Sequence, residues 1–351
     1  MVLYCVKHQG SDLHQHQHES LTQKMRLSKS SETTAVYYPV LATVGAPVNI
    51  VTIAILSFKD CGLSKCITRY LVAMAAADLM VIVWNVILHR VATIYWDYTF
   101  LLYTPVCRFI LFMSPAAIDI SVWLTVSFTF DRLVAICYQK LKTKYCTEKT
   151  AVVVITTVSS LLCLKNIPWP FLYSSYYNWR PWGCMLSTYF FIEPIMIAYS
   201  WIEQLLTPVI PFFLILFFNI VTVRRIVIAS RGRTSLRQHS SDRDENDPEL
   251  INRRRSIVLL FAISSSFILL WMTTVIYFIC VRITSAFKSR YILTPFPEFQ
   301  EAGIMLQLLS SCTNTAIYTI TQRKFRNMLL SAFKYPFTLI GKLVKCGRKH
   351  Y

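Results

Sequence analysis

Residues 107–138 read CRFILFMSPAAIDISVWLTVSFTFDRLVAICY, a nearly continuous apolar stretch that decides the fold of this chain. If the stretch is helical, the part from Cys107 to Arg132 rises about 37 Å, which is enough to cross a bilayer with a slight tilt. Asp131 and Arg132 lie side by side near one end of it. Because an ion without a partner costs several kcal/mol inside a membrane, this pair indicates either the membrane interface or a functional site.

The composition of the whole chain is typical of a protein that crosses the membrane several times. Of its 351 residues, 54% are apolar and 15% are charged, and the mean hydropathy is +0.45. Soluble domains are usually less apolar and more highly charged. We therefore predict an all-α membrane protein, a seven-transmembrane helix bundle with a short amphipathic cytoplasmic helix. The predicted spans are residues 36–58, 68–90, 104–137, 150–170, 199–225, 256–281 and 299–321.

The net charge of +18 is distributed in a way that predicts membrane topology rather than nucleic-acid binding. Basic side chains gather in alternate loops and in the tail after Arg323, and the positive-inside rule assigns those segments to the cytoplasm. The N-terminus is then extracellular and the C-terminus cytoplasmic, with anionic membrane lipids as partners of the bases and no nucleic acid expected. The loop bases are Lys59, Lys65, Arg69, Lys140, Lys142, Lys144, Lys149, Arg224, Arg225, Arg253, Arg254 and Arg255.

Polar segments flank the predicted membrane domain, residues 36–321. Residues 1–35 are expected to form an extracellular N-terminal tail. Residues 322–351 are expected to form an amphipathic helix and a cytoplasmic tail, because apolar residues recur there at helical spacing among Lys and Arg. The third inner loop, about residues 226–252, is polar and mixed in charge, which favours flexibility. The seventh span is the most polar, so the other helices are expected to shield it from lipid.

Two of the eleven cysteines are placed where a disulfide bond would be useful. Cys107 opens the third span, and Cys184 lies in the outer loop between the fourth and fifth spans. Both would face an oxidising compartment. A bond between them would pin the loop over the mouth of the bundle; the alternative is two free thiols.

Asp78 lies in the middle of the second predicted span, where a carboxylate is costly and suggests a function. Other spans supply hydroxyls and amides at a similar depth. These are Asn49, Ser121, Ser310, Ser311 and Asn314, with Tyr318 one turn below. Hard cations prefer oxygen ligands, so the group predicts a small-cation site, with sodium as the candidate ion and no other cofactor. Two alternatives are a protonated acid held by hydrogen bonds between helices, and a hydrogen-bonded switch.

Trp271 lies midway along the sixth predicted span. A large ring in a bundle core is usually a packing residue, and this is the interpretation that the residue alone favours. Its depth, just below an outer cavity of such a bundle, also suits a sensor of ligand contact.

Over about residues 36–335, the order and spacing of these motifs resemble those of the rhodopsin-like G-protein-coupled receptors. The matching positions are Asn49, Asp78–Leu79, Cys107, Asp131–Arg132, Cys184, Pro211, Trp271, Asn314, Tyr318 and Phe325. Each motif is weak alone, and their shared order makes the set specific. Within the family, YLVAMAAADLM, SVWLTVSFTFDRLVAIC and NTAIYTITQRKFR are most similar to the orphan receptors 139 and 142. Relatives of that group are associated with aromatic amino acids and peptides as ligands.

The resemblance implies a receptor of the plasma membrane, and not an enzyme, with a heterotrimeric G protein as its inner partner. An extracellular ligand, an amino acid or a peptide, would bind between the outer halves of spans three, five, six and seven. It would favour the state in which the inner end of span six has swung outward. Arg132, paired with Asp131 at rest, would then face the G protein. The implied switch consists of Asp131, Arg132, Trp271, Asn314 and Tyr318.

Three positions depart from the pattern of the family. Leu133 replaces the usual tyrosine after Asp-Arg, while Thr273 and Thr315 replace prolines of spans six and seven. A proline kinks a helix because it removes a backbone donor and clashes with the preceding turn. Without these prolines, spans six and seven are expected to be straighter, which bears on how easily the receptor is activated.

Polar and aromatic residues near the outer mouth are the candidates for a ligand site. Ser114 stands where amine receptors carry an aspartate, so a biogenic amine is disfavoured. Arg108 and Glu203 are suited to the carboxylate and the amine of an amino acid. For each candidate the alternative is interface anchoring or loop packing. The full set is Asn85, His89, Arg108, Ser114, Glu203, Tyr277 and Gln307.

Three other classes of function compete with a signalling receptor. A non-signalling decoy receptor would explain Leu133 and the lost prolines. A transporter or channel would explain Asp78 as a relay, but it predicts internal repeats, broken Gly-rich helices or charges in several spans, none of which is evident in the sequence. An intramembrane enzyme is the least favoured, because neither a His-Glu-x-x-His motif nor a pair of catalytic aspartates is present.

Overall fold

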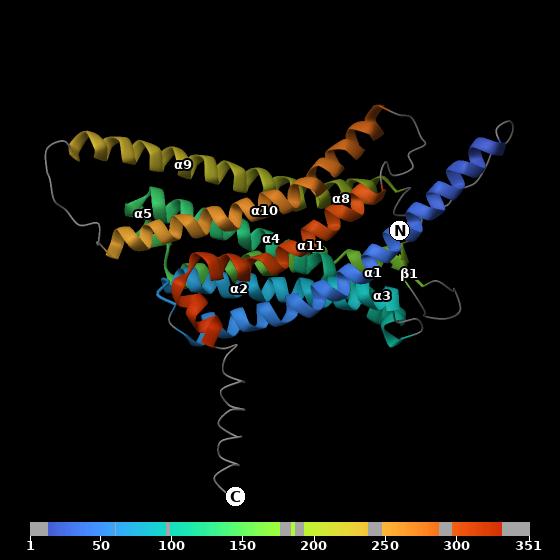
Figure 1. Cartoon of the computed structure of the whole chain (residues 1–351), viewed down its shortest axis with the longest axis horizontal. Helices are drawn as coiled ribbons and strands as arrows, with labels where there is room; N and C mark the ends of the chain where they lie inside the picture. Colours follow the sequence, from blue (N-terminus) through green and yellow to red (C-terminus); the bar gives the residue numbers. More distant parts are fainter. Residues whose placement is uncertain are drawn as a thin grey trace, which may run out of the picture.

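The computed structural model describes residues 13–59, 61–95, 99–175, 184–186, 193–237, 248–287 and 297–331. Within them, the chain forms a bundle of long helices, as Figure 1 shows, and the predicted all-α membrane fold is confirmed. The long helices are α1 (Leu13–Phe58), α2 (Lys65–Val81), α4 (Thr104–Cys137), α6 (Glu148–Asn166), α9 (Ile210–Arg237), α10 (Pro248–Phe287) and α11 (Pro297–Thr321).

Six stretches of the described chain are long and apolar enough to cross a membrane. They are Glu32–Phe58, Lys65–Tyr95, Thr104–Cys137, Glu148–Leu172, Pro194–Ile228 and Ser256–Val281. The seventh helix of the bundle is α11, whose Ser, Thr, Asn and Gln residues make it more polar. It packs against α10, α1 and α2, which is the shielded position expected of the most polar span.

Helix α4 occupies the centre of the bundle. Figure 1 shows it between α2 on one side and α9 and α10 on the other, and it packs against all three. Its bounds, Thr104–Cys137, agree with the predicted span 104–137. A proline in the first turn opens the helix, and the apolar run that follows stays helical to Cys137 although Pro115 lies inside it. On the half of α4 that carries Arg132, which we call the inner half, Phe128 packs edge-to-face on Tyr70 of α2, with the ring centroids 6.3 Å apart. The central helix is therefore fixed by aromatic packing as well as by its length.

The second span is longer than predicted and changes its winding halfway. Helix α2 continues into wider turns in η1 (Ile82–Val91) and then into the short α3 (Ala92–Tyr95). Wider turns of this kind are frequent near functional sites. Val81, Ile82 and Val86 are buried there against α1 and α4.

The fifth span is divided, whereas the sequence predicted one continuous helix over 199–225. Helix α8 (Pro194–Gln204) ends before η4 (Leu205–Val209), and α9 follows. Thr207 has a non-helical backbone, with φ −151° and ψ 110°. Pro208 lacks an N–H group and cannot continue the helical hydrogen bonds. The ring N–H of Trp123 on α4 donates to the carbonyl of Leu206 over 3.2 Å, so a neighbouring helix satisfies the broken turn.

At the outer end, the predicted disulfide bond between Cys107 and Cys184 is present, with the two Cα atoms 6.2 Å apart. Cys184 directly precedes β2 (Met185–Leu186), which pairs antiparallel with β1 (Tyr173–Ser174). The bond ties this two-stranded sheet to the top of α4. The short helices η2 (Phe100–Leu102) and η3 (Trp169–Leu172) complete the described outer loops.

On the opposite side, the helices extend further than the sequence suggested. Helix α9 runs to Arg237 and α10 begins at Pro248, so much of the third inner loop is helical. The loop between α4 and α6 contains α5 (Gln139–Tyr145). At the outer end, α1 begins at Leu13, inside the segment expected to be a tail.

The amphipathic helix expected after the seventh span is present over residues 323–331. Phe325 is fully buried and packs edge-to-face on Tyr318, with the ring centroids 5.8 Å apart. Arg323, Lys324 and Arg326 are exposed. The apolar side of this helix therefore faces the bundle, while its bases face outward.

Candidate functional site

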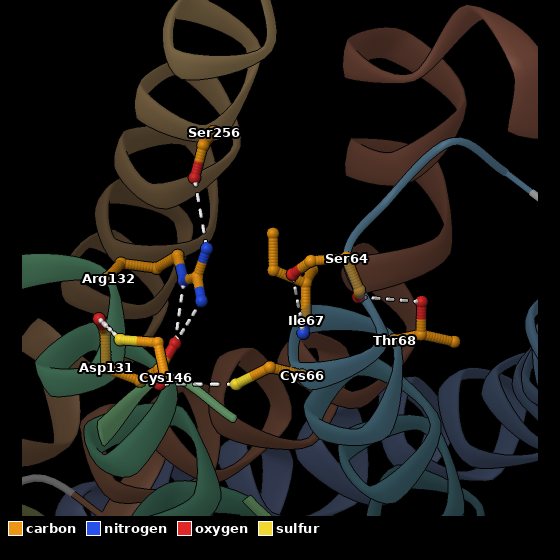
Figure 2. A network of polar contacts seen from close by, with 8 residues as sticks. All are labelled: Ser64, Cys66, Ile67, Thr68, Asp131, Arg132, Cys146 and Ser256. Carbon is orange, nitrogen blue, oxygen red and sulfur yellow. Dashed lines mark hydrogen bonds and ion pairs between the residues drawn. The ribbon is translucent and has the colours of Figure 1, made fainter. Parts of the chain in front are cut away.

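The inner ends of α4 and α10 meet at a network of polar contacts, which Figure 2 displays. Arg132 forms an ion pair with Asp131, and both side chains are buried. The guanidinium group of Arg132 also donates to the hydroxyl of Ser256 on α10 over 3.4 Å. A neutral hydroxyl at that distance makes a weak hydrogen bond. Arg132 is thus tied firmly to its neighbour on α4 and only lightly to α10.

Two cysteines complete the surroundings of Asp131. The thiol of Cys66, at the start of α2, donates to the carboxylate of Asp131 over 3.4 Å. The thiol of Cys146 donates to the backbone carbonyl of Asp131 over 3.6 Å. Burial and the neighbouring carboxylate of Asp131 raise the pKa of Cys146 to about 12, so this thiol keeps its proton at neutral pH. Sequence reasoning missed both cysteines, because nothing in their spacing connects them with residue 131.

The position of Cys66 follows from the way in which α2 begins. Ser64 is the N-cap residue, and its side chain accepts from the backbone N–H of Ile67 over 3.4 Å. The hydroxyl of Thr68 donates to the carbonyl of Ser64 over 3.2 Å. Figure 2 shows this capped turn holding Cys66 toward Asp131. A capping serine therefore sets the end of the helix and the place of the thiol together.

A second polar group lies at mid-depth around Asp78, which is almost completely buried. Its two carboxylate oxygens accept from the hydroxyl of Ser121 over 2.6 Å and from the side-chain amide of Asn314 over 2.7 Å. These residues line a cavity of about 20 Å³, which is enough for one water molecule. Ser310 and Thr313 also line the cavity and add two hydroxyl oxygens. The predicted meeting of spans two, three and seven thus takes place at this carboxylate.

Asn49 and Ser311 lie outside the cavity that Asp78 lines, although the sequence grouped them with it. The side-chain amide of Asn49 donates to the carbonyl of Ser311 over 2.8 Å and to that of Gly45 over 3.0 Å. The bond to Ser311 joins α1 to the backbone of α11, and the bond to Gly45 lies within α1. Their contribution is to the packing of the two helices, because neither side chain contacts the carboxylate of Asp78 in a described hydrogen bond.

Trp271 and Tyr318 lie above and below this polar layer. Trp271 stacks on Phe267, with the ring centroids 5.1 Å apart, and its ring N–H donates to the hydroxyl of Ser310 over 3.2 Å. The indole therefore packs in the core and also connects α10 to α11 at the edge of the cavity. The hydroxyl of Tyr318 is buried and has no hydrogen-bond partner among the described residues.

The outer candidates for ligand binding fall into separate places. Asn85 donates its side-chain amide to the hydroxyl of Ser114 over 2.6 Å, which brings two of them together between η1 and α4. His89 lines a different cavity of about 30 Å³ beside Cys107. Tyr277 donates to Gln300 over 3.1 Å near the outer ends of α10 and α11.

Two of the remaining candidates, Gln307 and Arg108, are not joined to Asn85 and Ser114 by any described contact. The backbone carbonyl of Gln307 accepts from Ser310 over 2.6 Å. The Nε atom of Arg108 is buried and has no hydrogen-bond partner among the described residues. The candidates therefore surround the outer mouth without converging on one described cavity.

Glu203 was expected to act beside Arg108 as one end of a site for an amino acid, and its surroundings differ from that expectation. Its carboxylate lies 2.8 Å from the ammonium group of Lys165 on α6, and the same ammonium lies 2.7 Å from Asp119 on α4. Sequence reasoning missed Asp119 and Lys165. Each is a charged residue inside an apolar run, which was itself the signal that could have identified them.

One further ion pair joins the outer ends of three helices. Arg90 on η1 contacts the carboxylate of Glu301 on α11 over 3.2 Å and the hydroxyl of Tyr38 on α1 over 3.0 Å. Tyr38 also donates to Glu301. The pair is partly exposed, so it fastens the outer rim of the bundle rather than its core.

A family model described as "7 transmembrane receptor (rhodopsin family)" matches residues 48–318. The match covers every span from the later part of α1 to Tyr318, and it includes both polar groups described above.

Proposed function

Because this chain belongs to the rhodopsin family of seven-transmembrane receptors, we propose that it binds an extracellular ligand and activates a heterotrimeric G protein. The family makes it a multi-pass membrane protein and a receptor. The observation that carries the coupling step is the network at the inner ends of α4 and α10. Arg132 is held there by Asp131 and, on α10, by the hydroxyl of Ser256 alone among the described contacts.

The proposed switch separates α10 from α4 at this inner end. Among the described contacts, one weak hydrogen bond joins Arg132 to α10 and must break, whereas the ion pair with Asp131 is made within α4. A ligand can shift the balance between the two states only by its difference in affinity for them. The contact of Trp271 with Ser310 supports a role for these residues between the outer half and the polar layer around Asp78.

A sodium ion near Asp78 is part of the proposal. The residues fit such an ion, because a carboxylate and the hydroxyls of Ser121, Ser310 and Thr313 line one small cavity. A bound cation would supply the positive charge that the buried carboxylate lacks among its described neighbours. Ser121 and Asn314 orient the carboxylate by donating to its two oxygens.

The ligand is proposed to be a small molecule or a peptide, with an aromatic amino acid as the first candidate. Support comes from the similarity of three segments to the orphan receptors 139 and 142. A biogenic amine is disfavoured because Ser114, hydrogen-bonded to Asn85, stands where amine receptors carry a carboxylate. Asn85 and Ser114 are the outer candidates that contact each other directly, so they are the first to substitute.

The proposed site of action is the plasma membrane, with the N-terminus outside and the C-terminus inside. The distribution of Lys and Arg supports this orientation. The exposed bases of the helix over 323–331 support contact with anionic lipid on the inner leaflet. Epitope tags at the two termini, probed in intact and permeabilised cells, test the orientation.

Nucleotide exchange on a panel of G proteins, measured in membranes that contain the full chain, tests the proposed coupling. Cells are first screened with amino acids and short peptides for calcium and cyclic AMP responses. The variant Arg132→Ala is expected to lose exchange while it still reaches the cell surface. Lys149→Ala removes an exposed base from the same side of the membrane and serves as the matched control. Full exchange by Arg132→Ala would contradict the role given to this arginine.

A non-signalling decoy receptor is the second candidate, because Thr315 and Thr273 replace prolines of the family. Saturable ligand binding without exchange on any G protein of the panel would favour it. A transporter or channel would instead be favoured by substrate flux in proteoliposomes.

A further inference from the structure

Three charged side chains from three helices meet in the outer half of the bundle. The ammonium group of Lys165 on α6 lies 2.7 Å from Asp119 on α4 and 2.8 Å from Glu203 on α8. The exposed fractions of the side chains are 5% for Asp119, 15% for Lys165 and 11% for Glu203. We refer to these three residues as the outer ion cluster.

The depth of the cluster makes it expensive to form. Asp119 lies midway along α4 between Cys107 and Asp131, so it is near the middle of the membrane. Its carboxylate accepts from Asn166 over 2.7 Å as well as from Lys165. Removing one partner of such a pair leaves an uncompensated buried charge, which is strongly destabilising.

The helix that carries Glu203 is separated from the rest of its span. Glu203 lies in the last turn of α8, directly before the broken turn at Leu205–Val209. Segments on the two sides of such a break can change their angle without disturbing each other, as hinges do. The orientation of α8 therefore depends on its own contacts with neighbouring helices.

Those contacts lie on two sides. Toward the fourth span, Tyr199 donates to the carbonyl of Lys165 over 3.5 Å and packs against Trp169, with the ring centroids 6.2 Å apart. Toward the sixth span, Trp201 packs edge-to-face on Phe278, with the centroids 6.3 Å apart. Among the described contacts of α8, the ion pair of Glu203 with Lys165 is the charged one, and it adds α4 through Asp119.

We propose that Lys165 is a positioning residue, which holds α8 against α4 and α6 and so sets the orientation of the outer half of the fifth span. The inference rests on the proposed function only because the proposed function assigns the outer half of the fifth span to the ligand site. The inference adds to that function an ion pair that holds α8 on the side that faces the fourth span. A ligand that moves α8 toward α10 must act against this anchor.

The number of unpaired charges that each substitution leaves in the outer ion cluster predicts whether the variant folds. Lys165→Met leaves two buried carboxylates without their ammonium partner, and folded receptor is expected to be lost from the cell surface. Lys165→Arg keeps the charge and is expected to restore it. Glu203→Gln leaves Asp119 and Lys165 as a matched pair, so the variant is expected to fold with α8 released. In the triple variant Asp119→Asn, Lys165→Met, Glu203→Gln, no ion remains in the cluster, and surface expression is expected to return.

The position of α8 is measured directly in the purified full chain. Spin labels are introduced as noncanonical amino acids at Leu161 on α6 and Ile195 on α8, because free cysteines preclude selective thiol labelling. Both sites are exposed, at 60% and 70%. The distribution of label distances is then recorded by double electron–electron resonance. Glu203→Gln is expected to broaden or shift this distribution. Glu193→Gln, the same change at the exposed N-cap of α8, is the matched control and is expected to leave it unchanged.

The outcomes decide the inference without a ligand or a G protein. An unchanged distribution in Glu203→Gln, or normal surface expression of Lys165→Met, overturns it. If Glu203→Gln does not fold, the triple variant takes its place, and a distribution like that of the wild type then overturns the inference. A wild-type chain that fails to drive nucleotide exchange would count against the proposed function alone, because none of these readouts involves a G protein.

Discussion

The hydroxyls of Thr52 and Thr315 lie 2.8 Å apart and join α1 to α11. Thr315 stands where the family carries a proline, so the departure adds a hydrogen bond between helices. Thr315→Val is expected to cost about 0.6 kcal/mol, the average for hydrogen bonds between membrane helices. Thermal unfolding of purified receptor measures the loss. Thr319→Val is the control, because its hydroxyl bonds only within α11 in the described contacts, to the carbonyl of Thr315. Equal stability of both variants and the wild type would contradict the role of the bond.

The weak contact of Arg132 with Ser256 predicts how basal signalling responds to charge. Ser256→Glu places a carboxylate on α10 opposite Arg132, and a charged acceptor makes a hydrogen bond about twice as strong as a neutral one. The resting state is then favoured, and basal nucleotide exchange is expected to fall several-fold. Ser256→Gln has the same length without the charge and is expected to change basal exchange less. Greater exchange in Ser256→Glu than in Ser256→Gln would be inconsistent with the resting role of this contact.

The raised pKa of Cys146 predicts a slow reaction with alkylating reagents. A thiol with a pKa of about 12 holds its proton at pH 7, and its thiolate fraction is about three orders of magnitude below that of a free cysteine. Cys146 is expected to be alkylated far more slowly than glutathione, and its rate should keep rising with pH beyond the point where the rate of glutathione levels off. Peptide mass spectrometry after timed alkylation gives the rate at Cys146 apart from the other free cysteines, and glutathione alkylated in parallel gives the reference rate. Alkylation as fast as that of glutathione at pH 7 would show that the thiol is not held against Asp131.

A sodium ion at Asp78 would make stability depend on the salt that is present. Sodium chloride is expected to raise the unfolding temperature above that in choline chloride at equal ionic strength, by an amount that grows with concentration. Asp78→Asn is expected to abolish the difference between the two salts. Differential scanning fluorimetry of the purified chain measures it. The same curve for the wild type in both salts would remove sodium from the proposal.

Helix α4 and the fifth span differ in how well the sequence predicted them, and the reason is physical. The bounds of α4 depend on its own residues, because Pro105 opens it and an apolar run continues to Cys137. The break before α9 depends also on Trp123, which lies on another helix. Its ring N–H donates to the carbonyl of Leu206, which the break leaves without a helical partner. A pattern within one segment does not contain that information.

Among the polar residues too, those set by their own span were predicted, whereas those set by a neighbouring helix were not. Asp78, Ser121 and Asn314 were grouped by their depth in the membrane. The position of a residue along its span gives this depth, because a helix rises by a constant distance per residue. Asn49 has the same depth, and only the rotation of α1 turns it toward the carbonyl of Ser311 instead. The partner of Glu203 could not be predicted either, since Lys165 approaches it through the packing of α6 on α4.

Helix α4 is joined to another part of the chain at every level of the molecule. Its disulfide bond is at the outer rim, Asp119 and Trp123 reach the fourth and fifth spans, and Arg132 meets the sixth at the inner end. This helix is therefore the central element that connects the other spans of the bundle. A turn or slide of α4 by a fraction of a helical pitch alters all of these connections in one motion, so substitutions along it should be scored for correlated effects rather than one position at a time.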